Sequence, residues 1–205
     1  ALIEAGAQVD YTDAEGWTAL MTACQDGNDL CARALLEAGA QVDHTNKGMT
    51  ALLWACQNGQ ASCVKVLSLY GATRQAAKEV AAGRGHHEIA TWLETTKDWT
   101  PLHHIEQLTP DHARDLLRDG AELHSGALER ARAGRSCKVS SMLVSAERWS
   151  MESHALFPAA ARGHAVEVLV LGYLLAWSPR YEAEATALVD VWRTCVMPHA
   201  ITRTG

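Results

Sequence analysis

Short amphipathic segments separated by glycines fill the first half of the chain. After Gly27 and after Gly59, apolar residues recur at spacings of three and four, which puts them on one face of an α-helix. These apolar positions are Cys31, Ala34 and Leu35, and then Cys63, Val66 and Leu67. Before each of the two glycines lies a shorter segment of small residues that begins at Thr18 or Thr50, and threonine is a favoured helix cap. The pattern therefore predicts pairs of short helices.

The paired segments recur at a nearly constant distance. Residues 37–43 repeat residues 4–10 without a change, at an offset of 33 residues from Gly6 to Gly39. Residues 48–52 match residues 16–20 at an offset of 32, with Met49 in place of Trp17. Such offsets indicate a stacked-repeat protein, in which each unit buries its apolar face against the next.

These units resemble ankyrin repeats, whose pattern is a glycine turn, a Thr-Pro-Leu-His helix start, a glycine, a second helix and Gly-Ala. Residues 100–103 match that helix start without a change. The resemblance implies an all-α fold, an ankyrin-repeat solenoid of antiparallel helix pairs joined by short hairpins. We expect the hairpins at residues 10–17 and 43–49, with no substantial β-sheet.

The pattern also predicts how the chain is divided. Residues 1–125 are expected to hold a partial first repeat, two full repeats, one truncated repeat and one variant repeat. Counted from the first full repeat, the third repeat is truncated because Gly59 and Gly85 are only 26 residues apart, and in the fourth Thr109-Pro110 replaces the glycine. Residues 126–148 are predicted to be a degenerate repeat or linker helices, and residues 149–205 a C-terminal helical cap. The partial first repeat suggests a fragment of a longer protein, with Leu2 and Ile3 partly exposed.

In the C-terminal segment the repeat period is lost. Residues 165–177 are apolar nearly all round, which predicts a central buried helix. A second amphipathic helix is predicted from Ser178-Pro179 to Pro198, with Trp192 on its apolar face. Residues 149–158 resemble a tail found in ankyrin proteins of unicellular algae, whose function is unknown.

Charge and apolar length disfavour two classes of partner. A formal net charge of −6 gives no overall attraction for a nucleic-acid backbone. The apolar run at residues 165–177 is too short to span a bilayer and includes Glu167. We therefore expect no nucleic acid, no membrane and no small-molecule substrate among the partners.

Cysteine usage favours an intracellular protein, cytoplasmic or nuclear. Cys24 and Cys56 are equivalent positions of successive repeats, as are Cys31 and Cys63. Equivalent helices pack roughly 8–10 Å apart, too far for a disulfide. No Cys-x-x-Cys occurs, so we expect buried free thiols and no metal site.

No catalytic motif is apparent. Nucleophile elbows, phosphate-binding glycine loops and His-x-x-x-His pairs are missing from the sequence. His86 and His103 stand where the ankyrin pattern expects histidine, which implies structural hydrogen bonds. We expect no enzyme and no cofactor; the weakest alternative is an enzyme whose acids and bases come from Glu152, His154, Glu182 and Asp190.

The resemblance implies that the chain binds another protein through its hairpin tips and the concave face of its first helices. The positions carried over are Ala14, Glu15, Trp17, Gln25, Asp26, Lys47, Met49, Gln57, Asn58 and Trp99. Trp17, Met49 and Trp99 would then be exposed anchors; the alternative is that each tryptophan packs within the molecule. As an exposed anchor, Trp17 would contribute less than about 1 kcal/mol to stability. A further alternative is a two-sided adaptor whose C-terminal helices bind a second machine, such as a ubiquitin ligase.

Overall fold

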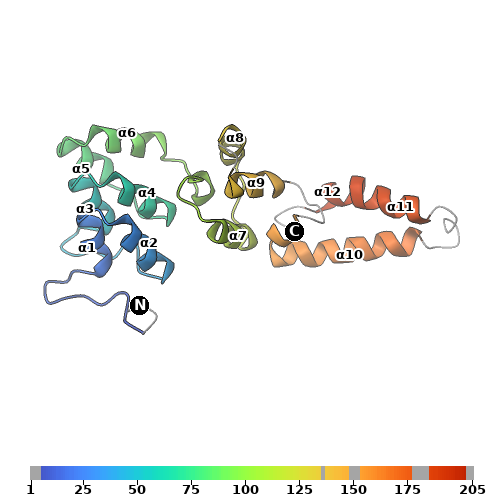
Figure 1. The fold of residues 1–205 in the computed structure, drawn as a ribbon, viewed down its shortest axis with the longest axis horizontal. Coiled ribbons are helices and arrows are strands. Elements are labelled where there is room, and N and C mark those ends of the chain that lie inside the picture. Colours follow the sequence, from blue (N-terminus) through green and yellow to red (C-terminus); the bar gives the residue numbers. More distant parts are fainter. Residues whose placement is uncertain (1–5, 135–136, 148–152, 177–184, 202–205) are drawn as a thin grey trace. The chain divides into compact units, whose positions relative to one another are not determined.

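The computed structural model describes residues 6–134, 137–147, 153–176 and 185–201. The chain divides into two compact units, Ala1–Gln107 and Leu108–Gly205. The first unit contains α1 (Ala19–Gln25), α2 (Asp29–Glu37), α3 (Ala51–Gln57), α4 (Ala61–Leu69), α5 (Ala77–Gly83), α6 (His87–Thr95) and the 3₁₀ turn η1 (Pro101–His103). Figure 1 shows α1 to α6 as stacked helix pairs, which confirms the predicted helical repeat architecture.

Threonine caps begin the first helix of both complete repeats. The Thr18 hydroxyl accepts a hydrogen bond from the backbone N–H of Met21 at 3.2 Å. The Thr50 hydroxyl accepts one from the N–H of Leu53 at 3.3 Å. Each cap satisfies a backbone donor that the first helical turn leaves unpaired, so helix formation starts at the predicted residue.

The predicted hairpins form without a sheet. In the part of the chain that is described, strand-like pairing consists of single antiparallel bridges between Thr12 and Thr18 and between Asn46 and Met49. In the second hairpin the two central residues, Lys47 and Gly48, both have positive φ, at 52° and 79°. Positive φ at both positions suits a tight two-residue turn. This explains how the loop before Met49 can be one residue shorter than the loop before Trp17.

Two aspartates of the repeated segment connect each repeat to the start of the next. The Asp10 carboxylate accepts a hydrogen bond from the N–H of Gln41 at 2.8 Å. The Asp43 carboxylate accepts from the N–H of Thr73 at 2.9 Å and from its hydroxyl at 2.6 Å. The identical residues therefore make the same contact one repeat apart, and successive repeats are fixed relative to one another.

Glycine is required between the two helices of a repeat for two reasons. Gly27 and Gly59 have φ values of 76° and 73°, which residues other than glycine rarely adopt. A Cβ at Gly27 would also lie 2.3 Å from the Gln60 side chain, and one at Gly59 would lie 2.5 Å from the His86 ring. The next repeat thus packs directly on the glycine backbone.

The core of the first unit runs continuously through its repeats. Leu20, Leu52, Leu67 and Leu93 are all buried and belong to one apolar cluster. The third repeat lacks a hairpin, as predicted, and the chain instead enters α5 through Ala76, which has a φ of 62°.

The Thr-Pro-Leu-His segment forms one 3₁₀ turn rather than the short α-helix of the earlier repeats. Thr100 and His103 cap each other reciprocally, but the turn ends at His103. Thr109 is extended, with a ψ of 153°, as expected for a residue before proline. The two compact units divide between Gln107 and Leu108, within the predicted fourth repeat, and the domain boundaries at 125 and 148 stay predictions.

The second unit is also helical. It contains α7 (Pro110–Arg118), α8 (Ser125–Ala133), α9 (Lys138–Ser145), the 3₁₀ turn η2 (His154–Leu156), α10 (Ala159–Ala176), α11 (Ala185–Val191), a π-helical turn (Trp192–Val196) and α12 (Met197–Ala200). The π-helical turn lies just before Pro198, where the missing N–H and the ring disturb regular helical hydrogen bonding. Leu2, Ile3, Trp149 and the predicted helix start at residues 178–181 lie outside the described residues.

Residues 165–176 are helical, as predicted, but the prediction that this helix is central and buried was wrong. In α10 the side chains of Val166, Val170 and Leu171 are 57%, 50% and 55% exposed. Within its unit α10 contacts α11, the π-helical turn and α12, and these neighbours cover one side of it. Ala161 and Ala165 lie on the covered side against Phe157. Figure 1 shows α10 paired with α11.

Candidate functional site: the hairpin ridge and a groove between α4 and α6

The first hairpin tip is held in place by its own polar residues and by the next repeat. The Asp13 carboxylate accepts hydrogen bonds from the N–H groups of Glu15 and Trp17, both at 2.9 Å. The side-chain amide of Asn46 donates to the carbonyl of Glu15 at 3.0 Å. Ala14, Glu15 and Lys47 are exposed on these tips. They are therefore presented on an ordered backbone, which reduces the entropy that binding would cost.

Trp17 packs within the molecule. Its ring lies 4.6 Å from that of Trp54 in α3, centroid to centroid, with an angle of 34° between the planes. Trp17 and Met49 are both partly buried against the same apolar core. Intramolecular packing, one of the two alternatives for Trp17, is thus present, although the residue is not fully buried. Trp54 was not among the predicted site residues, because the pair joins non-equivalent positions of adjacent repeats.

Trp99 does not continue a row with Trp17 and Met49. It lies in a separate aromatic cluster, with ring centroids 6.2 Å from Trp92, 5.9 Å from His103 and 5.2 Å from His104. The backbone N–H of Trp99 donates to the Thr96 carbonyl at 3.0 Å, in a turn after α6, and the ring packs against side chains of α6 and η1.

The predicted concave positions end the first helices. Gln25 and Gln57 are the last residues of α1 and α3, and Asp26 and Asn58 are the exposed residues that follow. The Asn58 amide donates to the carbonyl of Trp54 at 2.9 Å. The backbone carbonyls of Gln25 and Gln57 are also occupied, accepting from the next repeat. The Asp26 side chain is exposed, the side chains of Gln25 and Gln57 are partly exposed, and that of Asn58 is held against its own helix.

The structural role predicted for two histidines is confirmed. The Nε2–H of His86 donates to the carbonyl of Gln57 at 3.3 Å, which links α6 to the end of α3. Nδ1 of His103 accepts from the N–H of Thr100 at 3.1 Å and completes the cap of η1. Among the described residues, no group of three or more His, Cys, Asp or Glu side chains could hold a metal ion.

The cysteines that the structure describes are free thiols, and two of them meet. Cys24 of α1 and Cys63 of α4 are both fully buried and hydrogen-bonded to each other. This contact joins non-equivalent positions, so the spacing argument about equivalent cysteines did not predict it. The hydrogen bond to Cys63 together with burial raises the pKa of Cys24, and burial raises the pKa of Cys56 to about 12. The Cys24 and Cys56 thiols are therefore protonated at neutral pH and unreactive. The hydrogen bond to Cys24 lowers the pKa of Cys63, but Cys63 is fully buried and closed to reagents.

Cys137 differs from the buried thiols and should be reactive. It is exposed at the start of α9, and its sulfur lies 3.1 Å from the Ser140 hydroxyl and 3.3 Å from the Ser140 N–H. These hydrogen bonds lower the pKa of Cys137, so its thiolate persists to lower pH than that of an ordinary cysteine. We expect Ser140→Ala to slow alkylation of Cys137 by iodoacetamide at pH 7 by about twofold or more, by raising the pKa.

Peptide mapping by mass spectrometry would measure the rate at Cys137, with exposed Cys31 as the internal reference. The pH midpoint of alkylation should move upward in Ser140→Ala. An unchanged midpoint, with equal rates in both proteins, would show that Ser140 does not stabilise the thiolate.

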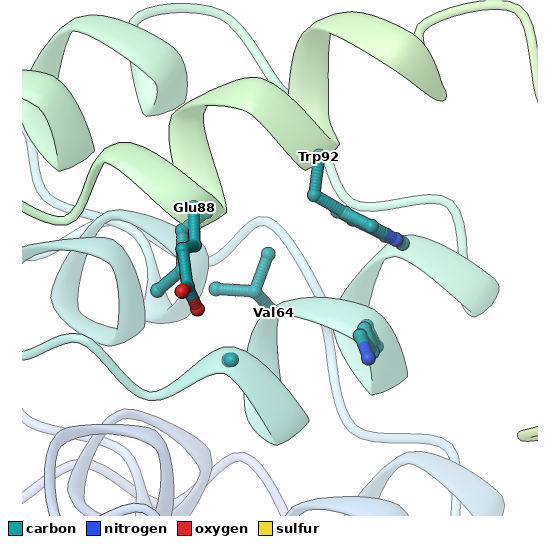
Figure 2. A pocket seen from close by; sticks show the side chains of 6 residues that line it. Val64, Glu88 and Trp92 are labelled. Atoms are coloured by element: carbon teal, nitrogen blue, oxygen red, sulfur yellow. The ribbon is translucent and has the colours of Figure 1, made fainter.

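A groove that the sequence did not reveal lies between the second helices of two repeats. It has a volume of about 190 Å³ and is lined by Ala61, Val64, Lys65, Glu88, Ile89 and Trp92. Figure 2 shows Val64 between Glu88 and Trp92, which project from α6 one helical turn apart. The spacing of Glu88 and Trp92, four residues on one helix, was the available sequence signal.

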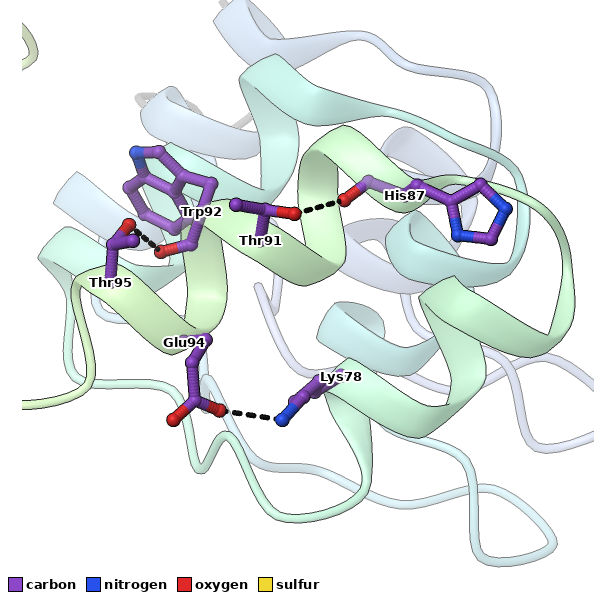
Figure 3. Close-up of polar contacts among 6 residues, drawn as sticks. All are labelled: Lys78, His87, Thr91, Trp92, Glu94 and Thr95. Atoms are coloured by element: carbon purple, nitrogen blue, oxygen red, sulfur yellow. Dashed lines mark hydrogen bonds and ion pairs between the residues drawn. The ribbon is translucent and has the colours of Figure 1, made fainter.

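The outer side of α6 continues this surface. His87, Glu88, Thr91, Trp92 and Thr95 line a shallow depression there. Figure 3 shows the Thr91 hydroxyl donating to the carbonyl of His87, at 2.8 Å, and the Thr95 hydroxyl donating to that of Trp92, at 3.0 Å. Because both hydroxyls bond to their own helix, the threonine methyl groups are left as the outward surface.

Comparison with known proteins agrees with this architecture. A family model for ankyrin repeats, in three copies, matches residues 1–79. The crystal structure of the human ASB11 ankyrin repeat domain is similar to this chain at 30% sequence identity, covering 71% of this chain and 76% of that one, with a TM-score of 0.45. No curated protein sequence matches the chain. With three ankyrin repeats matched in residues 1–79, the chain belongs to the ankyrin-repeat family.

Ankyrin repeats are in general protein-interaction modules, and the fold is a class of non-enzymatic scaffold. In the described part of the chain, each helix is too short or too polar to cross a membrane.

Proposed function

We propose that the chain is a non-catalytic scaffold that binds a protein partner through its hairpin tips and the ends of α1 and α3. The ordered first hairpin is the observation that carries this proposal. Asp13 and Asn46 fix the backbone around Glu15 at 2.9 and 3.0 Å, while the Glu15 side chain itself is exposed. A polar loop that is fixed by several hydrogen bonds, and has no core role for its outward side chains, suits recognition.

Charge favours a protein as the ligand. The tips carry both signs, with Glu15 and Asp26 on one repeat and Lys47 on the next, and the chain has a formal net charge of −6. A nucleic-acid surface would need a basic stripe, and a membrane surface would need a basic apolar face. The described free cysteines fit a reducing compartment, cytoplasm or nucleus.

Site-specific photo-crosslinking in a lysate of the source cells would test this surface. A photoreactive residue at Glu15 or at Lys47 should crosslink to the same partner protein. A matched probe at Ala34, which is exposed on α2 away from the hairpins, should not. If all three positions capture the same proteins equally, or if no protein is captured at the tips, the proposed surface is wrong.

A second candidate is a two-sided adaptor. It is favoured by the exposed apolar side chains of the C-terminal unit, Val166, Val170 and Leu171 in α10 and Val191 in α11. Apolar groups gathered on one hairpin of helices are typical of a second interaction surface, for example toward a ubiquitin ligase. A photoreactive residue at Val170 should then crosslink to a protein different from that captured at Lys47.

A further inference from the structure

The groove between α4 and α6 has an apolar floor and two ends of opposite charge. Val64 and Ile89, which form the floor, are 1% and 5% exposed. Gln60 and His86 are equivalent residues that precede α4 and α6. Lys65 therefore corresponds to Thr91 along the two helices and lies near the level of Trp92, and Ala61 corresponds to His87 and lies near the level of Glu88. The groove is acidic at one end and basic at the other, one helical turn away.

Neither charged residue is neutralised within the described part of the chain. Ion pairs form elsewhere on this unit, as between Lys78 and Glu94 at 2.6 Å (Figure 3), but Glu88 and Lys65 make none. Glu88 is exposed and Lys65 is half-buried, so both can reach a ligand seated over Val64. A ligand that complements the groove carries a cation at the Glu88 end and an anion at the Lys65 end.

The wall at the basic end is held rigidly. The guanidinium carbon of Arg74 lies 5.7 Å from the centroid of the Trp92 ring, and Arg74 donates to the Thr96 carbonyl at 2.5 Å. His104 and Trp99 contact the same indole, with ring centroids 5.9 and 6.2 Å away. Because Trp92 is fixed before any ligand arrives, the groove needs little ordering on binding.

The cation of a ligand belongs at Glu88 rather than over the indole. Arg74 already occupies a position over the Trp92 ring, and Lys65 lies at that end of the groove. A second cation there would meet two like charges, whereas at Glu88 it meets an unpaired carboxylate. The centre of the groove, between these ends, accepts an aliphatic group.

We propose that this groove binds an amphipathic helix of a partner protein, which inserts one aliphatic side chain over Val64. A basic residue on one side of that side chain pairs with Glu88, and an acidic residue on the other side pairs with Lys65. The volume of about 190 Å³ is below the range of small-molecule pockets and suits a single side chain. The methyl groups of Thr91 and Thr95 extend the apolar surface along α6 for the rest of the helix.

Three alanine-based helical peptides provide the test, titrated into the full chain. Each presents a central leucine flanked one turn away on both sides by charged residues: Lys and Glu, Lys and Lys, or Glu and Glu. Binding is followed by the chemical shift of the Trp92 indole N–H, which is assigned with Trp92→Phe. The Lys and Glu peptide should bind at least about threefold better than either like-charged peptide, the size expected of one partly exposed ion pair.

Two charge reversals should switch the preference. Glu88→Lys makes both ends basic and should favour the Glu and Glu peptide, while Lys65→Glu makes both ends acidic and should favour the Lys and Lys peptide. Glu79→Lys, on the exposed surface of α5, changes the net charge as Glu88→Lys does and should leave the wild-type order intact.

Several outcomes would overturn the proposal. They are no saturable shift at Trp92 with any peptide, the same order of affinities in all variants, or self-association of the chain that Glu88→Lys abolishes. The last would assign the groove to a second copy of the chain. No hairpin residue is changed in these variants, so the result is independent of the function proposed for the tips.

Discussion

Leu52→Ala should lower the free energy of unfolding by about 3 kcal/mol, within the range of roughly 2–5 kcal/mol for buried leucines. Leu52 is fully buried in α3, and α3 packs against α1, α4 and α5. Truncation therefore removes apolar contacts and leaves a cavity that neighbouring helices on several sides cannot all move to fill. Leu20 in α1, 2% exposed, should behave in the same way. Urea unfolding followed by circular dichroism would measure the loss.

Leu30→Ala is the matched control for these substitutions. Leu30 lies in α2 and is 74% exposed, so the same truncation should change stability by less than about 0.5 kcal/mol. A cost at Leu30 equal to that at Leu52 would contradict the repeat register, because the register assigns Leu52 and Leu20 to the core.

The repeat offset predicted those features that depend on equivalent positions. Once residues 37–43 were aligned with residues 4–10, the sites of Thr18 and Thr50, and of Gly27 and Gly59, followed from the period. The aspartates show why this works, since Asp10 and Asp43 each accept a hydrogen bond from a backbone N–H at the start of the next repeat. A contact that recurs in every repeat can therefore be predicted from the repeat period.

Contacts between non-equivalent positions could not be predicted in that way. The Trp17 ring contacts Trp54, which lies within α3 of the next repeat and not on its hairpin. Cys24 of α1 likewise contacts Cys63 of α4. Such pairs depend on the length and orientation of each side chain at the interface between repeats. The repeat period gives no information about either. The groove beside Trp92 is of the same kind, because its walls come from two repeats and its rigidity from Arg74.

The C-terminal unit shows a different limit. Hydrophobicity all round α10 indicates that every face should be covered, yet Val166 and Val170 are half-exposed or more. The sequence shows that a helix face is apolar. It does not show whether that face is covered by the same chain or by another protein. The wrong prediction of a central helix therefore points to the same surface that favours a second partner.

Trp17→Ala should destabilise the chain by about 2 kcal/mol, more than the 1 kcal/mol limit expected from its loop position. The indole is partly buried against the core and lies 4.6 Å from the Trp54 ring, and such an aromatic pair contributes roughly 0.5–1.5 kcal/mol beyond its buried area. Chemical denaturation of Trp17→Ala, Trp54→Ala and the double variant would measure the coupling between the rings, expected at about 1 kcal/mol.

The same variants separate folding from recognition. If the exposed edge of Trp17 is an anchor for the partner captured at Lys47, Trp17→Ala should weaken that complex by about 2 kcal/mol or more. Met49→Ala is the comparison, since Met49 occupies the equivalent position and is also partly buried against the core. Trp54→Ala should lower stability but weaken binding less than Trp17→Ala does. In that variant the backbone N–H of Trp17 still donates to the Asp13 carboxylate at 2.9 Å, which keeps Trp17 in place on the hairpin. Equal losses of affinity in Trp17→Ala and Trp54→Ala, in proportion to their losses of stability, would make Trp17 a purely structural residue.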